Sequence, residues 1–241
     1  MDLVAEYREQ ERWRRWDDAI AMLPLSPGQT VLDLGCGAGA VSRRLRARGV
    51  EVIGIDADDA LLAAARADCP GVHFENGDAR RIDRTVDGIW TSFVTAYLGD
   101  LASVVAHWRA CLRPGGFLAM VEVDDLLGHA PLALPFDAPR FYDEARGRYD
   151  FEAGRKLARA ARDAGLEITD EIELPDDELA FTGPASDAVL AAWRRRLARM
   201  GGLKTFLGDD FVRFEAAFLG ALADSAHRTT TRVMLVIARR A

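Results

Sequence analysis

Residues 31–39 read Val-Leu-Asp-Leu-Gly-Cys-Gly-Ala-Gly, a short apolar run that leads into three closely spaced glycines. The run predicts a buried strand, and residues 40–48, closed by Gly49, predict a helix that begins directly after the glycines. Glycines at such a turn let the backbone approach a ligand closely, and the amides at the start of a helix favour negative charge. The stretch therefore predicts a strand, a ligand-binding loop and a helix, the opening unit of an α/β sheet.

Similar units continue along the chain. Apolar runs separated by helical patterns predict further strands at residues 51–55, 72–74, 87–92 and 117–123. Strands that alternate with helices indicate a parallel sheet with helices on both faces. Two later apolar segments, residues 166–174 and 230–238, predict a sixth and a seventh strand, and the near-continuous apolar character of the last one predicts burial on both faces.

The bulk properties narrow the class of protein. The 241 residues are 49% hydrophobic and carry a net charge of −7, which suits an α/β domain with its own core and disfavours a nucleic-acid partner. Cys36, Cys69 and Cys111 lack the spacing of a metal site, so no metal is expected and a reduced, cytoplasmic compartment fits best. The sequence has no signal-peptide pattern at its start and no long apolar span, so no membrane partner is expected.

The glycine loop alone fits two kinds of cofactor. Ala40 completes a dinucleotide fingerprint, and Asp56 stands where an acid would hold ribose hydroxyls with either cofactor. Asp33 favours a cofactor with a cationic amino acid group over a dinucleotide. A carboxylate beside a pyrophosphate is repelled, whereas one beside a cationic amino acid group is attracted. Asp78, which follows the third strand, offers an acceptor to an adenine amine. A nicotinamide-dependent oxidoreductase is therefore the less favoured alternative.

Four motifs together are similar to those of class I S-adenosylmethionine (SAM)-dependent methyltransferases: residues 31–39, Gly54-Ile55-Asp56, Gly77-Asp78-Ala79 and residues 112–116, Leu-Arg-Pro-Gly-Gly. The resemblance covers roughly residues 27–124. It implies a Rossmann-like α/β fold with a seven-stranded, mostly parallel sheet, an antiparallel last strand, and a helical insertion between strands six and seven. It also implies SAM as the cofactor and S-adenosylhomocysteine (SAH) as its product.

The resemblance implies one domain over residues 1–241, divided by role. Residues 1–26 would form a helical lid, residues 27–125 the SAM-binding core, and residues 126–150 a substrate-side segment. Residues 184–227 would form a helical insertion, acting either as a cap over the substrate or as structural cladding, and a dimer interface is a further possibility for it. A monomer and a homodimer both stay open.

Cofactor roles follow from the same resemblance. The loop backbone would contact the methionine part, Asp33 its ammonium group, and Asp56 the ribose, with Asp78 at the adenine amine. Aromatic side chains of the lid would lie against the sulfonium by cation–π attraction. The residues assigned to the cofactor are Tyr7, Trp13, Asp33, Gly35, Cys36, Gly37, Asp56, Ala57, Asp78, Ala79, Ser92 and Phe93.

Absent motifs narrow the methyl acceptor. The fourth strand ends in Ser92-Phe93-Val94-Thr95, without the Asn/Asp-Pro-Pro-aromatic motif of enzymes that methylate nucleic-acid or protein amides, and without an acidic metal ligand. Five aromatic residues and one arginine are predicted to contact the acceptor and to form a mostly apolar cap that suits a small hydrophobic or aromatic metabolite: Phe136, Arg140, Phe141, Tyr142, Trp193 and Phe206.

The expected reaction is in-line methyl transfer to an N, O or C atom of a small biosynthetic molecule. His129 and Tyr97 are the candidate bases, although proximity and alignment alone can suffice. A descendant that keeps SAM for a non-methylating reaction, such as a cyclisation, is the alternative, because its cofactor motifs would be unchanged.

Overall fold

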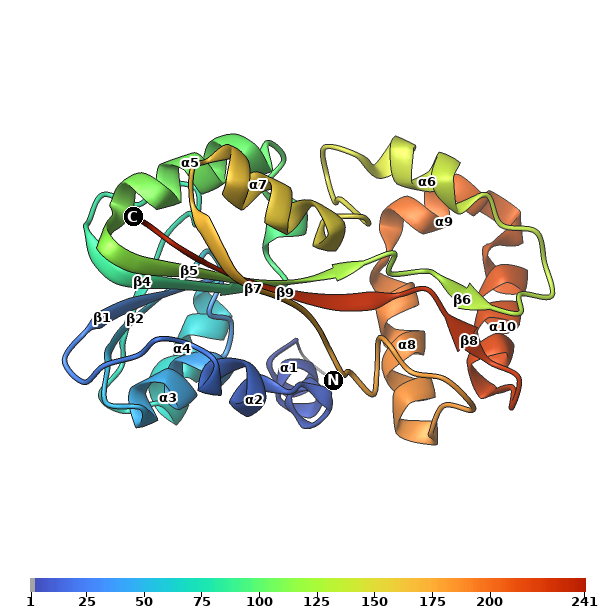
Figure 1. The fold of residues 1–241 in the computed structure, drawn as a ribbon. Helices are drawn as coiled ribbons and strands as arrows, with labels where there is room; N and C mark the ends of the chain where they lie inside the picture. The colour runs from blue at the N-terminus through green and yellow to red at the C-terminus, as the bar shows by residue number, and fades with distance from the viewer. Residues whose placement is uncertain (1–2) are drawn as a thin grey trace.

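A computed structural model of the protein describes residues 3–241. In this part of the chain, seven strands form one sheet in the order β3-β2-β1-β4-β5-β9-β7 (Figure 1). β9 runs antiparallel to both of its neighbours, and the other adjacent pairs are parallel, so the predicted sheet with an antiparallel last strand is confirmed. The strands are β1 (Thr30–Leu34), β2 (Glu51–Asp56), β3 (His73–Asn76), β4 (Val86–Ser92), β5 (Leu112–Asp124), β7 (Glu167–Leu174) and β9 (Arg232–Arg239).

The sheet order fixes where a ligand can bind. β1 lies inside the sheet, third in this order, and the chain places β2 on one side of it and β4 on the other. Ligands of open α/β sheets bind beyond the carboxyl ends of the strands at such a reversal of strand order. In the register of the sheet, Asp33 lies beside Gly54 and Trp90, so the end of β1 and its glycine loop lie at this point.

Helices cover both faces of the sheet, as Figure 1 shows. One face carries α3 (Ala40–Ala47) and α4 (Asp59–Asp68), and the other carries α5 (Leu101–Cys111) and α7 (Leu157–Asp163). Alternate residues of β1 face opposite layers: Val31 packs into one buried cluster, whereas Leu32 and Leu34 pack into the other. This two-residue alternation is the ordinary geometry of a strand between two layers.

The apolar spacing of residues 6–23, from Tyr7 to Leu23, favours a single helix in the sequence, and the structure differs from it. The N-terminal segment forms α1 (Leu3–Gln10), a 3-10 turn at Glu11–Trp13 and α2 (Trp16–Ala21), with Arg14 extended between the last two. Trp13 and Trp16 are both buried, and the side chain of Arg14 reaches acids of a distant loop. Tertiary packing therefore breaks the helical pattern.

The predicted helical insertion lies between β7 and β9. It consists of α8 (Asp187–Arg199), α9 (Gly201–Leu207), a 3-10 turn and α10 (Phe211–Ala223). Together with α6 (Ala138–Ala145) and a two-stranded ribbon of β6 (His129–Ala130) and β8 (Arg228–Thr229), these helices form the end of the molecule at the right of Figure 1. The ribbon was not predicted from the sequence, because each of its strands has two residues.

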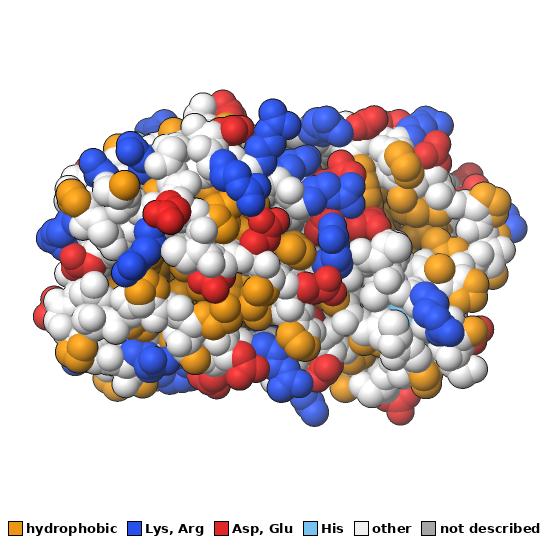
Figure 2. Space-filling view, viewed as in Figure 1, with side chains coloured by type: hydrophobic (Ala, Val, Ile, Leu, Met, Phe, Trp, Pro, Cys, Tyr) orange, Lys and Arg blue, Asp and Glu red, His pale blue; other side chains and the backbone are white. Residues whose placement is uncertain are grey.

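The surface view agrees with the mixed charge pattern of the sequence. On the face that Figure 2 shows, basic and acidic side chains are interspersed, and neither sign forms a continuous track. None of the helices among the described residues has the length and apolar character needed to cross a membrane.

Candidate functional site

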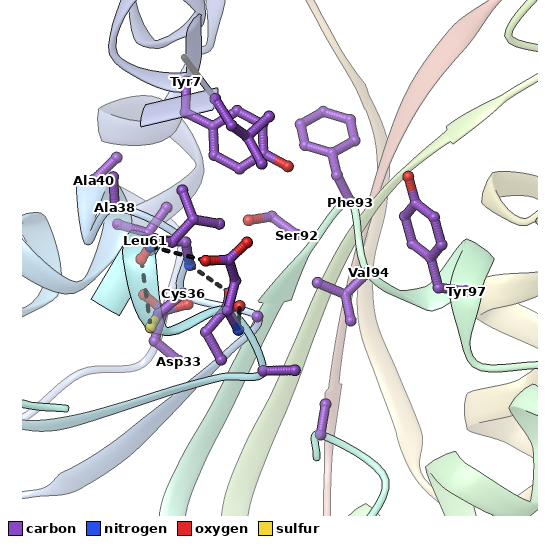
Figure 3. A pocket seen from close by; sticks show the side chains of 18 of the residues that line it. Tyr7, Asp33, Cys36, Ala38, Ala40, Leu61, Ser92, Phe93, Val94 and Tyr97 are labelled. Carbon is purple, nitrogen blue, oxygen red and sulfur yellow. Dashed lines mark hydrogen bonds between the residues drawn. The ribbon is translucent and has the colours of Figure 1, made fainter. Parts of the chain in front are cut away.

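A cavity of about 820 Å³ opens beyond the carboxyl ends of β1, β2 and β4 (Figure 3). It brings together most of the residues assigned to the cofactor from the sequence. Those that line it are Tyr7, Asp33, Gly35, Cys36, Gly37, Asp56, Ala57, Asp78, Ala79, Ser92 and Phe93, and Tyr97 lies at its far end.

The glycine loop has a backbone that other residues adopt only with strain. Gly35, Gly37 and Gly39 have φ angles of 71°, 52° and 83°. The amide of Gly35 donates to the carbonyl of Ile55 at 2.7 Å, which holds the loop against the end of β2. A Cβ atom on Gly35 would lie 2.1 Å from Cγ2 of Val94, so this position has no room for a side chain.

Two carboxylates lie on either side of this loop. Asp33 is 1% exposed, accepts a hydrogen bond from Oγ of Ser42 at 2.6 Å, and has its pKa raised to about 7 by burial. Asp56 accepts from the amide of Gly37 at 2.8 Å and from the amide of Asp58 at 2.9 Å. Backbone donors thus orient the Asp56 carboxylate at the end of β2. Negative charge at this end of the cavity favours a ligand with cationic and hydroxyl groups.

The thiol of Cys36 and the loop after β3 complete the lining at the glycine-loop end of the cavity. Burial raises the pKa of Cys36, so its thiol stays protonated and unreactive. The carboxylate of Asp78 accepts from Nε of Arg80, and this hydrogen bond lowers the pKa of Asp78. Nε1 of Trp108 donates to the carbonyl of Ala79 at 2.8 Å, which fixes the loop beside the cavity.

Aromatic side chains border the middle of the cavity. Figure 3 shows Tyr7 on the side of the glycine loop and Phe93 across from it. Phe93 has a φ angle of 57°, a conformation that costs energy for a residue with a side chain and often marks a functional site. Its ring packs edge-on against Trp16 at 5.8 Å between centroids, and Cζ of Arg14 lies 5.1 Å from the centre of the Phe93 ring.

Two predicted residues do not reach the cavity. Trp13 is buried in the core with Arg12 over its ring, and Trp16, three residues on, lines the cavity instead. His129 is 3% exposed in β6, where its Nδ1 lies 3.0 Å from Nε2 of His227. Burial lowers the pKa of His129 to about 3, so the structure contradicts its assignment as a base in the site.

A second cavity of about 400 Å³ continues from the first, past Tyr97. Phe141 lines it. The other aromatic and basic residues predicted to contact an acceptor pack within the cap or on its surface and do not line it: Phe136, Arg140, Tyr142, Trp193 and Phe206. Among residues 3–241, no three His, Cys, Asp or Glu side chains gather as a metal site would require.

A buried ionic network at the junction of the two cavities was not predicted from the sequence. Arg14 donates to Asp176 at 2.8 Å and to Glu178 at 2.5 Å, and Arg196 donates to Glu178 at 2.7 Å. Burial by itself would raise the pKa of Glu178, but the charges of Arg196 and Arg14 outweigh it and lower this pKa to about 2. These acids belong to a short polar stretch that resembles an ordinary surface loop.

Comparisons with known proteins agree with this geometry. A family profile described as a methyltransferase domain matches residues 5–171. The trans-aconitate 2-methyltransferase of Methylobacterium radiotolerans is 36% identical over 122 residues, and the match spans 49% of this chain and about half (47%) of that protein. The 27-O-demethylrifamycin SV methyltransferase of Amycolatopsis mediterranei is 30% identical over 206 residues, which cover 81% of this chain and 71% of that protein.

The fold is also shared with solved structures. The crystal structure of the cyclase SpnF has a TM-score of 0.62 to this chain at 20% identity, covering 95% of this chain and 80% of that one. At this identity the likeness concerns the fold alone. The family match spans more than half of the sequence and includes the glycine loop, both carboxylates and β4. The chain therefore belongs to the class I SAM-dependent methyltransferase family.

Proposed function

We propose that the protein transfers the methyl group of SAM to a small molecule with a hydrophobic or aromatic body. The observation that carries this proposal is the continuity of the two cavities. One end has the glycine loop and Asp56, and the other end has aromatic walls, with Tyr97 and Tyr149 lining both. A donor and an acceptor can therefore lie end to end, as in-line displacement requires.

The residues of the first cavity fit SAM. Gly35 and Gly37 line the cavity, and their positive φ angles turn the loop so that a ligand can lie against its backbone. Asp56 has a carboxylate oriented toward the ribose position, Asp33 places a buried acid near the ammonium position, and Phe93 offers a ring face to the sulfonium. When bound, SAM supplies an electrophilic methyl group on a sulfonium.

Tyr97 acts as a hydrogen-bond donor in this proposal. Partial burial raises the pKa of Tyr97, and burial raises the pKa of Tyr149 further, so both phenols are protonated at neutral pH. A protonated phenol orients an acceptor but removes no proton from it. The chain then accelerates transfer by aligning the acceptor with the methyl group, and a protonated acceptor loses its proton to solvent before it enters the site or after the product leaves it.

Two segments are proposed to cover the site. Tyr7 of the N-terminal segment borders the cavity, and Arg199 of α8 lines both cavities. Arg199 donates to Glu6 of α1 at 2.7 Å, so the lid and the cap are joined directly over the acceptor end. This contact supports residues 1–26 as a lid and residues 184–227 as a substrate cap.

A binding experiment tests the donor half of the proposal. Isothermal titration with SAH, SAM and NAD should give binding of both sulfur ligands and none of NAD. Asp56→Ala should lose SAH affinity by about tenfold or more, because its charged hydrogen bonds to the ribose are removed. Asp83→Ala is the matched control, since the Asp83 side chain is 91% exposed and does not line the cavity. Binding of NAD alone would refute the proposal.

The second candidate is a SAM-binding enzyme that catalyses a cyclisation, which the shared fold with the cyclase SpnF keeps open. Incubation with SAM and a metabolite extract separates the two by mass spectrometry. Methyl transfer adds the mass of one methyl group to a metabolite and produces SAH. Turnover of a metabolite without any SAH formation would favour the cyclisation.

A further inference from the structure

The second cavity has a charge character opposite to that of the donor end. Three arginines line it, Arg148, Arg196 and Arg199, and no acidic side chain from residues 3–241 does. The donor cavity, by contrast, is lined by several carboxylates, Asp33 and Asp56 among them. The rest of the second cavity is aromatic, aliphatic or phenolic. Its lining therefore suits a ligand with an apolar body and a negative group.

Two of these arginines are held in place from behind. Glu178 accepts from Nη2 of Arg196, and Glu6 accepts from Arg199. Both acids are buried, at 0% and 2% exposure, and neither lines a cavity. Each pair occupies only part of the guanidinium group, and both arginines line the second cavity. Nε of Arg196 is buried and has no hydrogen-bond partner among the described residues.

Arg148 adds a positive charge that no acid in the described part of the chain neutralises, unlike the charges of Arg196 and Arg199. It is exposed, and within residues 3–241 no acidic side chain pairs with it. A Cβ atom on Gly202 would lie 4.0 Å from Nη2 of Arg148, which places this guanidinium at the start of α9 and beside the cavity. Two residues earlier, Arg146 pairs with Asp143 at 2.6 Å and lies outside the cavity lining. The two arginines thus differ both in pairing with an acid and in lining the cavity.

Tyr97 and Tyr149 add two phenol hydrogen-bond donors to the three arginines of the second cavity. Their rings meet edge-on, with 4.9 Å between the centroids of Tyr97 and Tyr149. Both phenols are protonated at neutral pH and can donate to an anionic oxygen. Phe141 and Leu126 line the same cavity and can bury an aromatic or aliphatic body. Guanidinium groups bind carboxylate and phosphate oxygens with paired hydrogen bonds.

We propose that the second cavity is an anion-binding subsite for the methyl acceptor, formed by Arg148, Arg196 and Arg199. The acceptor class is a small organic anion, with a carboxylate or a phosphate attached to an apolar body. This inference rests on the proposed function, because the subsite is defined by its continuity with the donor cavity. A fully apolar acceptor would leave buried guanidinium N–H groups without partners, whereas an anionic group would accept hydrogen bonds from them.

Titration with three simple probes tests the subsite in the presence of saturating SAH. Benzoate and phenyl phosphate carry a negative group on an aromatic ring, and benzamide is the neutral match of benzoate. We expect at least one anion to bind about tenfold more tightly than benzamide, since charged hydrogen bonds are the stronger ones. The tighter of the two anions identifies carboxylate or phosphate as the group recognised.

Two variants locate the binding. Arg148→Gln should weaken binding of the preferred anion about fivefold and leave benzamide unchanged, because the residue is partly solvated. Arg146→Gln removes the same charge two positions away and should leave both affinities unchanged. Arg196→Lys keeps the charge beside Glu178 but loses the planar fork, and should also weaken the anion.

The outcomes separate this inference from the proposed function. Equal affinity for benzoate, phenyl phosphate and benzamide, with SAH bound normally, would overturn the anion subsite and leave SAM binding intact. Equal effects of Arg148→Gln and Arg146→Gln would overturn it as well, since they would indicate a general charge effect. Failure of SAH itself to bind would instead refute the proposed function.

Discussion

Substitution of Glu178 by Gln tests whether the buried ionic network stabilises the junction of lid and cap. Glu178 is fully buried and accepts from Arg14 at 2.5 Å and from Arg196 at 2.7 Å. Its pKa is lowered from the usual 4.5 to about 2. At about 1.36 kcal/mol per pKa unit, this difference in pKa corresponds to about 3 kcal/mol in favour of the folded state with Glu178 charged. Breaking a buried pair by removing one charge costs about 3–5 kcal/mol, which agrees in size.

The measurement is urea unfolding at neutral pH. Glu178→Gln should lower the free energy of unfolding by about 3 kcal/mol, and the melting temperature by about 6–12 °C for a chain of this length. Glu171→Gln is the matched control, because Glu171 pairs with Arg162 at 3.0 Å on the surface. An exposed pair contributes about 1 kcal/mol or less. A loss below about 1 kcal/mol in Glu178→Gln, or equal losses in both variants, would refute the reasoning.

The pH dependence provides a second readout of the same network. A carboxyl whose folded pKa is lowered contributes stability above its unfolded pKa, and this contribution is lost as the pH falls toward its folded pKa. For Glu178 the loss falls between about pH 4.5 and pH 2. Burial raises the pKa of Asp176 and the charge of Glu178 adds to this rise, so in the wild type Asp176 offsets part of the loss from Glu178. The difference between wild type and Glu178→Gln should therefore shrink over this range, and a constant difference would contradict the assignment.

Three further predictions concern the donor cavity and the excluded base. Gly35→Ala should reduce SAH affinity by more than about tenfold in titration and should also destabilise the fold. The new Cβ would lie 2.1 Å from Cγ2 of Val94, and the φ angle of 71° is strained for alanine. Unchanged binding would contradict this prediction. SAM affinity should rise between about pH 6 and pH 8 as Asp33 ionises, and Asp33→Asn should abolish the rise. Since the folded pKa of Asp33 is raised, the same group lowers stability as the pH rises from about 4 to 7. His129→Asn should leave the pH profile of methyl transfer unchanged while it lowers stability, whereas loss of the acidic limb of that profile would restore His129 as a base.

The sheet could be predicted because its determinants are local. Each buried strand is a short apolar run, and the loop at residues 35–39 has glycines where the backbone requires positive φ angles. The N-terminal segment was predicted less well for the opposite reason. The tryptophans at 13 and 16 fit one helix by spacing, but the extended Arg14 between them is bound by acids more than 160 residues away. No local pattern carries that information.

The site shows the same division. Residues at the ends of β1, β2 and β4 were predicted to converge, because parallel strands end at one edge of the sheet. His129 was placed wrongly because its position after β5 suggested that edge, whereas its pairing in β6 turns it into the cap core beside His227. The arginines of α8 follow a helical pattern that is typical of a solvated face. Their role depends on buried acids that the sequence does not bring near them.

The pairing of these arginines affects how the acceptor end can select its ligand. Arg196 and Arg199 are each matched by a buried acid behind them, so their charges largely cancel beyond the first contact distance. An anion is then recognised mainly through short, directed hydrogen bonds, while Arg148 supplies the attraction at longer range. Short-range recognition in a partly apolar cavity is insensitive to salt and sensitive to shape. Selection among anions should therefore depend more on the fit of the apolar body than on total charge.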